Sequence, residues 1–479
     1  MSSENARRLH PVAVLFEAVQ ITRHWLGVLL GGGVAALASN GLPVHVVVAA
    51  GVALLISGSA VWGVLYWRTT SYWIAEGSFV LHRGVLSRKQ RTIPLERIQS
   101  VDVVQGVLQR LFGVVEVRVE TAGGGSRSPE AVLPALNREA AEALRRELEG
   151  PGTAGEGRRP PDKTLRRLST GDLLLAGATS GQIGIALSLI GAAWQAADNF
   201  LPQDLTLRLA ERFAPHSAVG WASLALAAGL LAWLLSIGGT VLAYAGFTLS
   251  REGGMLHIRR GLLERNEATL PVSRIQAVRI VEGVLRQPLG LVTLRVESAG
   301  YGKDAGVSTT LFPLLPRTRA HELLLAVVPE FAADPVLHRP PARARRRYAI
   351  RSALPAAALA AALILLFTTL ADAGPPGLLP VLVVPPALLY GLLRHRDTGW
   401  AISGDRLVLR TRRLSRTTTI IPLRCLQSRS VVQNPLQRRA RLAGFQVSIA
   451  SGRGRVHTTI TDLDAASAHT LLVRTGSPA

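Results

Sequence analysis

The chain reads IPLERIQS at residues 93–100, LPVSRIQA at 270–277 and IPLRCLQS at 421–428. Each stretch carries a proline at its second position and a glutamine at its seventh, so the three are versions of one motif. The motif returns after 177 residues (270 − 93) and again after 151 (421 − 270). Self-similarity of this kind marks a repeated structural unit, and it therefore decides the architecture of the whole chain.

The segments that follow the motif repeat as well. GVLQRLFG at residues 106–113 returns as GVLRQPLG at 283–290, and VRVETAG at 117–123 returns as LRVESAG at 294–300. The third copy has VSIASG at 447–452, after a small insertion rich in arginine. The chain is therefore expected to contain three copies of one polar domain.

Each copy combines strand patterns with one closing helix. In the first copy VEVRVE at residues 115–120 alternates apolar and charged residues, which is typical of a strand with one buried face. Leu136, Ala140, Leu144 and Leu148 then recur four apart, which predicts an amphipathic helix. Several strands and one terminal helix in about 80 residues predict a small barrel or bent sheet capped by the helix.

Long stretches without charged residues separate the copies. Apolar residues make up 48% of the chain, charged residues 18%, and the mean hydropathy is +0.27. Since a bilayer span needs about 20 apolar residues, these stretches predict six transmembrane helices in three hairpins. The predicted spans are 24–39, 44–67, 172–197, 218–246, 352–371 and 377–393. The last is short and contains three prolines, so a re-entrant or interfacial segment is the alternative there.

The arginines predict the orientation. Of the 54 basic residues, only Arg208 and Arg212 lie in the segments that join the two helices of a hairpin. Positive residues stay on the cytoplasmic side, so both termini and all three polar domains are expected inside the cell. A signal peptide cleaved after Ala36-Leu37-Ala38 is an alternative for the first span, and it would leave the downstream orientation unchanged.

The order of these motifs resembles the bacterial pleckstrin-homology (PH) domains. The resemblance rests on LHRGVL at residues 81–86, the IPLERIQS motif, GVLQRLFG and the following alternating strand. More narrowly, the layout is similar to bacterial membrane proteins of the YdbS/YdbT type, in which such domains follow transmembrane hairpins. The resemblance implies a seven-strand bent barrel with a C-terminal helix for each copy, and it implies no known biochemical activity. The third copy departs from it, because Gly84 and Gly261 have no glycine counterpart near Arg412 and Cys425 replaces the motif's arginine.

These patterns together predict an α+β membrane protein with eight segments. They are an N-terminus with hairpin 1 (1–68), PH-like domain 1 (69–150), a linker (151–171), hairpin 2 (172–246), PH-like domain 2 (247–335), a basic linker (336–351), hairpin 3 (352–393) and PH-like domain 3 (394–479).

Catalytic constellations are absent from the sequence. Cys425 is the single cysteine, the histidines are scattered, and neither a phosphate-binding loop nor a nucleophile elbow occurs. We therefore expect no enzyme activity, no cofactor and no metal site. Apart from Asp172 at the very start of the third span, the predicted spans carry no Asp, Glu, Lys or Arg, which disfavours an ion pathway and makes a transport or export component the alternative rather than the leading function.

Charge distinguishes the third copy. Residues 395–479 hold 14 basic and 4 acidic residues, a net charge of +10, whereas 68–150 and 247–335 each carry +2. The candidate contacts for anionic lipid are Arg410, Arg412, Arg413, Arg416, Arg438, Arg439 and Arg441. Nucleic acid is not expected as a partner, because the domain holds only Trp400 and Phe445 for base stacking.

The leading hypothesis is a multi-pass protein of the bacterial inner membrane. It would act as a non-enzymatic scaffold or adaptor whose three PH-like domains bind anionic lipid, a partner protein or a second copy of the chain, with a role in envelope maintenance.

Overall fold

The computed structural model describes residues 6–28, 44–121, 130–149, 164–181, 184, 187–192, 195, 217–298, 310–370, 375–451 and 454–476. The chain divides into two compact units. Unit 1 comprises Met1–Thr164, Ser250–Pro271 and Gly302–Val307, and unit 2 comprises Leu165–Leu249, Val272–Tyr301 and Ser308–Ala479.

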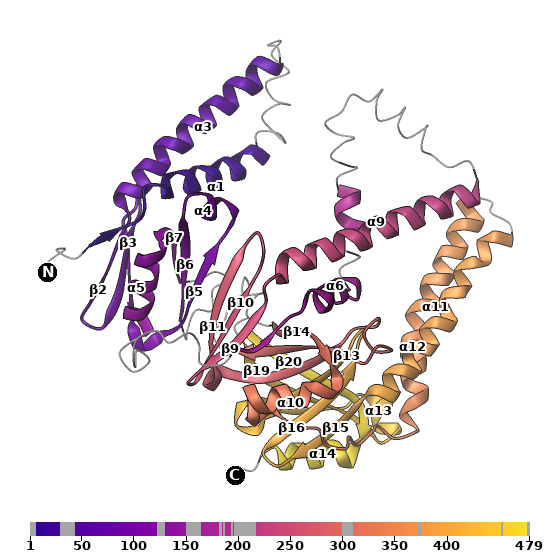
Figure 1. The fold of residues 1–479 in the computed structure, drawn as a ribbon. Coiled ribbons are helices and arrows are strands. Elements are labelled where there is room, and N and C mark those ends of the chain that lie inside the picture. The colour runs from indigo at the N-terminus through magenta and orange to yellow at the C-terminus, as the bar shows by residue number, and fades with distance from the viewer. Residues whose placement is uncertain are drawn as a thin grey trace. The chain divides into compact units, whose positions relative to one another are not determined.

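Unit 1 contains the first copy of the repeat (Figure 1). Its elements are β1 (Arg7–Arg8), α1 (Ala13–Val28), α3 (Val44–Thr69), β2 (Ser71–Ala75), β3 (Ser78–Arg83), β4 (Lys89–Pro94), β5 (Ile98–Gln105), α4 (Val107–Leu111), β6 (Val114–Thr121), β7 (Ala131–Asn137) and α5 (Arg138–Glu149). One antiparallel sheet has the order β1-β2-β3-β4, and β5, β6 and β7 form a second antiparallel array. Phe79, Leu133 and Leu144 are completely buried in one core, so both arrays and α5 pack together.

The first strand of this copy precedes its hairpin in the sequence. Arg7 and Arg8 of β1 pair with Tyr72 and Ser71 of β2, although α1 and α3 lie between these strands along the chain. The same arrangement recurs in the third copy, where His338 forms a bridge with Trp400 on the far side of its hairpin. The segments before the hairpins, which the sequence predicts as terminus and linker, therefore supply strands to the sheets.

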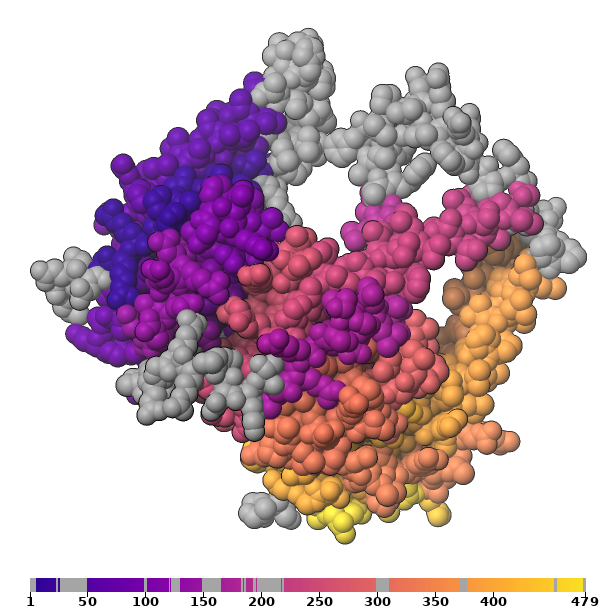
Figure 2. Space-filling model, viewed as in Figure 1, coloured from indigo at the N-terminus to yellow at the C-terminus, as the bar shows by residue number. Residues whose placement is uncertain are grey.

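Unit 2 contains most of the remaining elements. They are α6 (Thr170–Ala178), α9 (Ala218–Tyr244), β12 (Ile275–Glu282), β13 (Leu291–Ser298), β14 (Thr310–Pro316), α10 (Arg317–Val327), α11 (Ala344–Leu370), the 3-10 helix η6 (Pro375–Val383), α12 (Val384–Asp397), β15 (Gly399–Ser403), β16 (Arg406–Arg412), β17 (Arg416–Pro422), β18 (Leu426–Val432), α13 (Pro435–Arg439), β19 (Leu442–Ser451), β20 (Gly454–Asp464) and α14 (Ala465–Arg474). Phe445 and Leu471 are fully buried in the core of the third copy, which places α14 against the strands as α5 lies in the first. The hairpin of α11 and α12 projects from this domain (Figure 2).

Consecutive copies share continuous sheets. In unit 1, β5 of the first copy pairs with β11 (Arg265–Pro271), which pairs in turn with β10 (Met255–Arg260) of the second copy. In unit 2, β12 of the second copy pairs with β17 of the third, within a six-stranded sheet of order β14-β13-β12-β17-β16-β15. Short elements β8 (Thr164–Arg167) and β9 (Thr248–Glu252) lie at the boundaries of the two units along the chain. We call the β5–β11 and β12–β17 pairings the first and second junctions.

Four helical segments of the described residues are long and apolar enough to cross a membrane: Ala50–Thr69, Val219–Tyr244, Ala344–Thr369 and Gly377–Asp397. The predicted span 24–39 lies largely outside the described residues, and 172–197 is described in part. Their described parts begin earlier than predicted. The helix α1 starts at Ala13, which is buried against the adjoining domain, and α6 starts at Thr170, where the side chain of Ser169 caps it.

The third hairpin also differs from the sequence expectation. Its first helix begins at Ala344 rather than at residue 352, because Ala344 and Tyr348 are buried against Leu442 of the domain. The proline-rich stretch after it forms η6 and continues into α12. In the first copy, Leu136 lies in β7, which ends at Asn137, and the closing helix starts at Arg138. The four-residue periodicity therefore predicts a helix that begins too early, because its first leucine belongs to the strand.

The third copy lacks this glycine because its β16–β17 loop is shorter than the equivalent loops of the other two copies. Gly84 has a φ of 129°, and a Cβ there would lie 2.0 Å from the Ser87 carbonyl oxygen, so only glycine fits. Gly261 is similar, with a φ of 103°. In the third copy β16 and β17 stay paired up to Arg412 opposite Arg416, which removes the left-handed position.

Candidate membrane-surface site

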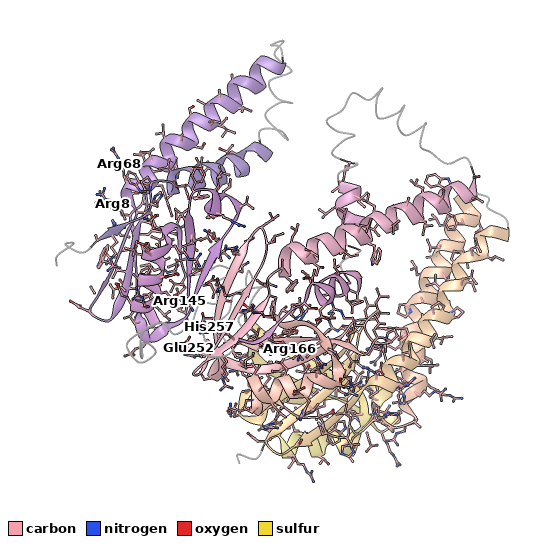
Figure 3. All side chains as sticks on the ribbon, in the orientation of Figure 1. Arg8, Arg68, Arg145, Arg166, Glu252 and His257 are labelled. Atoms are coloured by element: carbon pink, nitrogen blue, oxygen red, sulfur yellow. The ribbon has the colours of Figure 1, made fainter. Side chains whose placement is uncertain are left out.

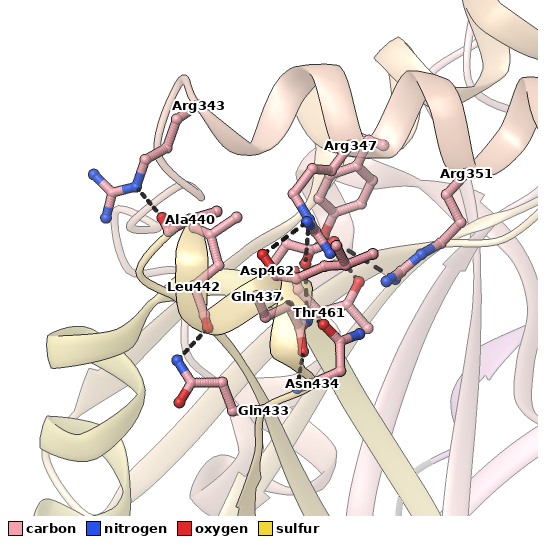
Figure 4. Close-up of polar contacts among 12 residues, drawn as sticks. Arg343, Arg347, Arg351, Gln433, Asn434, Gln437, Ala440, Leu442, Thr461 and Asp462 are labelled. Atoms are coloured by element: carbon pink, nitrogen blue, oxygen red, sulfur yellow. Dashed lines mark hydrogen bonds and ion pairs between the residues drawn. The ribbon is translucent and has the colours of Figure 1, made fainter.

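The third hairpin is joined to its domain by arginines of α11. Arg347 Nε lies 3.3 Å and Arg351 Nη1 3.5 Å from the two oxygens of Asp462, whose side chain is 1% exposed (Figure 4). Arg343 bonds to Asp464 and donates to the Ala440 carbonyl oxygen over 3.0 Å. These arginines precede the predicted span and looked like topology signals, but they hold the helix to β20 and α13.

The short helix α13 supplies further hydrogen bonds to the region around Asp462. Asn434 caps this helix with a capping box to Gln437, and Gln437 Nε2 donates to Asp462 Oδ1 over 2.8 Å. Arg347 Nη1 donates to the Leu436 carbonyl oxygen over 3.1 Å. The short helix α13 is therefore fixed at the base of the hairpin, where the domain meets the first turns of α11.

The structure divides the seven predicted lipid-contact arginines into two groups. Arg412 forms an ion pair with Asp397, the last residue of α12, and these two side chains are 10% and 9% exposed. Arg416 donates its Nε to Glu282 Oε1 over 3.0 Å, and Arg410 donates its Nε to Thr418 Oγ1 over 3.0 Å. These three arginines are partly or largely covered and bonded to partners within the protein, so the proposed lipid contact rests on the other four.

The other four arginines are exposed. Arg413 lies in the β16–β17 loop, and Arg438, Arg439 and Arg441 lie on and just after α13. Both segments sit at the base of the third hairpin, because Arg412 adjoins the end of α12 and α13 adjoins the start of α11. Two leucines in the same segments are also exposed, Leu414 by 77% and Leu436 by 63%. We call Arg413, Leu414, Leu436, Arg438, Arg439 and Arg441 the basal surface.

Exposed leucines recur at the equivalent positions of the other copies. Leu86 and Leu263 correspond to Leu414 and are 88% and 49% exposed. Leu108 and Leu285 correspond to Leu436 and are 42% and 50% exposed. Both positions therefore keep an exposed apolar side chain in every copy, so neither leucine belongs to the core of its domain.

The segment equivalent to α13 meets a hairpin helix in each copy. In the first copy Phe112, which follows α4, forms an edge-to-face contact with Phe16 of α1 at 6.5 Å between ring centroids. In the second, Arg286 Nη2 donates to the Ala176 carbonyl oxygen of α6 over 2.9 Å, and its Nε donates to Thr179 Oγ1 over 3.0 Å. Burial lowers the pKa of Arg286 to about 10. Each domain therefore carries its exposed leucine segment beside the start of its hairpin.

A cavity of about 240 Å³ lies at the second junction. Its charged lining residues are Glu282, Arg317, Asp334 and Arg410, so both signs of charge face the space. Burial, followed by the nearby guanidinium groups of Arg317 and Arg416, lowers the pKa of Arg410. The cavity has the character of an internal charge network rather than of a site for one class of ligand.

The first junction contains a buried carboxyl group. Asp102 of β5 accepts a hydrogen bond from the backbone N–H of Thr269 in β11, while its Oδ1 has no partner. Arg145 of α5 bonds to Thr269, and its Nη2 lies 3.5 Å from His257 Nδ1 (Figure 3). Burial raises the pKa of Asp102 to about 7, and the Thr269 bond and the charge of Arg145 counter this only in part.

This shift predicts a stability that falls with rising pH. The unfolded carboxyl has a pKa of 3.8, so between about pH 4 and pH 7 the folded chain holds a proton that the unfolded chain has lost. Asp102→Asn should remove this loss and raise the thermal midpoint at pH 8, with little effect at pH 4. Thermal unfolding in detergent across pH 4 to 8 measures both effects. A variant with the same pH slope as the wild type would show that Asp102 does not titrate there.

The described residues contain no group of three or more His, Cys, Asp or Glu that could hold a metal ion. The sequence reasoning missed Asp397, Glu282 and Asp462 as partners of the arginines, because they lie far from them along the chain. It also missed the exposed leucines, although their recurrence at the repeat spacing was a signal that could have revealed them.

Comparison with known proteins covers all three copies of the repeat. The model of the bacterial PH domain matches residues 26–151, 200–328 and 350–475. The chain is also 31% identical over 479 residues to the UPF0699 transmembrane protein YdbT of Bacillus subtilis (strain 168), and this match covers 95% of each chain. No solved structure matches the chain.

Proposed function

Because the chain belongs to the bacterial PH domain family and carries three copies of that domain in a transmembrane protein, we propose that it is a non-enzymatic membrane scaffold. Its domains lie on the cytoplasmic face of the bacterial inner membrane, and the third copy contacts anionic lipid headgroups through the basal surface. The observation that carries the proposal is the pairing of exposed arginines with exposed leucines at the base of a hairpin.

The physical chemistry of this surface favours an anionic bilayer. A leucine side chain gains by entering the acyl boundary, and each arginine near an anionic leaflet contributes on the order of 1 kcal/mol. The net charge of +10 on residues 395–479 acts in the same direction. Six spans in three hairpins, each leading into a helix-capped bent barrel, complete the proposed organisation, and the four apolar helices support it.

Lipid contact is tested with an environment-sensitive dye on the full chain. A Cys425→Ala background carries Leu436→Cys or Leu414→Cys, labelled with the dye and reconstituted in vesicles that contain a lipid-borne quencher. We expect strong quenching in vesicles with anionic lipid, and weaker quenching in neutral vesicles or at high salt. Equal, weak quenching in all vesicles would overturn the proposal.

The matched control is Val473→Cys. Val473 lies on α14 of the same domain and is 68% exposed, but α14 lies away from the third hairpin (Figure 1). Its dye should stay in water and escape quenching under every condition. Replacing Arg438, Arg439 and Arg441 together by glutamine should reduce the dependence on anionic lipid while leaving the thermal midpoint unchanged, because these side chains are exposed.

A further inference from the structure

The two junctions join the three copies of the domain in a row and leave one strand edge unpaired in the first copy and one in the third. The repeat makes β4, β11 and β17 equivalent strands, and it makes β5, β12 and β18 a second equivalent set. The junctions join β11 to β5 and β17 to β12. In the described part of the chain, β4 pairs only with β3 and β18 only with β19, so each lies at the edge of its sheet.

Both junctions use the same register. Arg265 faces Gln105 at the first junction, and Arg416 faces Glu282 at the second. Arg416 follows Arg265 by 151 residues and Glu282 follows Gln105 by 177, which are the two repeat spacings. Because the strands meet in one register twice, the junction is a defined docking mode of this domain.

The open edges are less covered than their paired equivalents. In β4 the four residues from Lys89 to Thr92 are exposed, whereas Thr269, which corresponds to Thr92, is 3% exposed. In β18 the residues from Gln427 to Ser430 are exposed, whereas Ala277 and Val278 at equivalent positions of β12 are completely buried. An uncovered strand edge is a template for another strand unless charge or a bulge protects it.

We infer that β18 of one chain pairs with β4 of a second copy of this chain, in the register of the two junctions. That register places Arg88 opposite Gln433, Lys89 opposite Val432 and Gln90 opposite Val431. The Arg88–Gln433 pair repeats the chemistry of Arg265 and Gln105. Farther along, Arg91 faces Ser430 and Thr92 faces Arg429, so no two like charges are opposed, although both edges are basic.

The contact is heterologous, because one edge meets a different edge of its partner. Such head-to-tail contacts give rings when the rotation closes and open rows when it does not. This inference is independent of lipid contact at the basal surface.

Cysteine crosslinking of two differently tagged full-length chains tests the pairing. In a Cys425→Ala background one chain carries Lys89→Cys and the other Val432→Cys, so a disulfide between them must be intermolecular. Facing residues of paired antiparallel strands have Cα atoms about 4.5–5.5 Å apart, which is within the Cα range of disulfides. After co-reconstitution and mild oxidation, we expect a dimer that contains both tags.

Two controls make the outcome decisive. Asn266→Cys with Val104→Cys on one chain should crosslink internally, because these residues face each other at the first junction. Lys89→Cys with Arg439→Cys on separate chains should not crosslink, because Arg439 is exposed but lies outside the strands. Absence of the mixed dimer while the internal control reacts would overturn the inference. A single chain with Lys89→Cys and Val432→Cys that crosslinks only to itself would also overturn it.

Substitutions that introduce a charge at position 433 provide a second test of the register. Gln433→Glu would recreate the carboxylate of Glu282 opposite Arg88 and should raise the crosslinked fraction, whereas Gln433→Arg should lower it. The change in association is expected to reach about fivefold in either direction. An unchanged yield with both substitutions, at unchanged thermal midpoints, would contradict the proposed register.

Discussion

Glu282→Ala is expected to lower the free energy of unfolding of unit 2 by about 3 kcal/mol. Its carboxylate is 3% exposed and accepts two hydrogen bonds from Arg416, with Arg317 Nη1 3.8 Å away. Removing it leaves the half-buried guanidinium groups of Arg410 and Arg416 close together at the second junction, with Asp397 near Arg416 and Asp334 near Arg410 in partial compensation. Thermal unfolding in detergent should show a midpoint roughly 5–10 °C lower.

Glu330→Ala is the matched control for this substitution. Glu330 also forms an ion pair with an arginine, Arg424, but the two side chains are 51% and 56% exposed. Exposed pairs of this kind contribute less than about 1 kcal/mol, so the midpoint should barely move. Equal effects of the two substitutions would show that burial at the junction does not set the strength of the Glu282 pair.

Gly391→Val should disrupt the third hairpin. A Cβ at Gly391 of α12 would lie 2.5 Å from the Tyr348 carbonyl oxygen and 2.7 Å from Ala349 Cα, both in the backbone of α11. Backbone atoms cannot rotate away, so the helices must separate at the place where α11 is fixed to the domain. We expect a loss of at least about 3 kcal/mol, beyond the usual range for overpacking.

The control for this effect is Gly58→Val. Gly58 lies on α3 of the first hairpin, and a Cβ there would meet no atom within 4 Å. Retention of the wild-type thermal midpoint by Gly58→Val and its loss by Gly391→Val would locate the effect at the close approach. If Gly391→Val also unfolds at the wild-type temperature, the α11–α12 packing is looser than the contact distances indicate.

The repeat explains how much of the fold the sequence predicts. The three motif copies identify the domains and the family, because agreement between the copies shows which residues the domain pattern requires. The helix limits at Ala344 and Ala13 are missed, because burial against the domain extends each helix past its apolar run. The β5–β11 and β12–β17 pairings cannot be predicted from local periodicity, since they join strands more than 130 residues apart.

The candidate site is predicted only in part. Clustering along the sequence groups Arg410, Arg412 and Arg416 with Arg438. The spacing of charges shows which arginines are close along the chain, but it does not show the residues with which each arginine bonds in the fold. The structure removes the first three by pairing them with Thr418, Asp397 and Glu282. Arg413 and the arginines of α13 remain in the candidate site. The exposed leucines beside them complete it, and composition alone does not distinguish these leucines from buried ones.

The strand that precedes each hairpin constrains the order of events during synthesis. Residues of β1 leave the ribosome before α1 and α3, but their partner β2 follows both helices, so this sheet cannot close until the whole hairpin has been synthesised. The edge of β5 then waits for β11, which is translated only after the second hairpin. Maturation of each domain therefore waits for synthesis of the hairpin inside it, and a chain stalled between hairpins would carry an unfinished sheet.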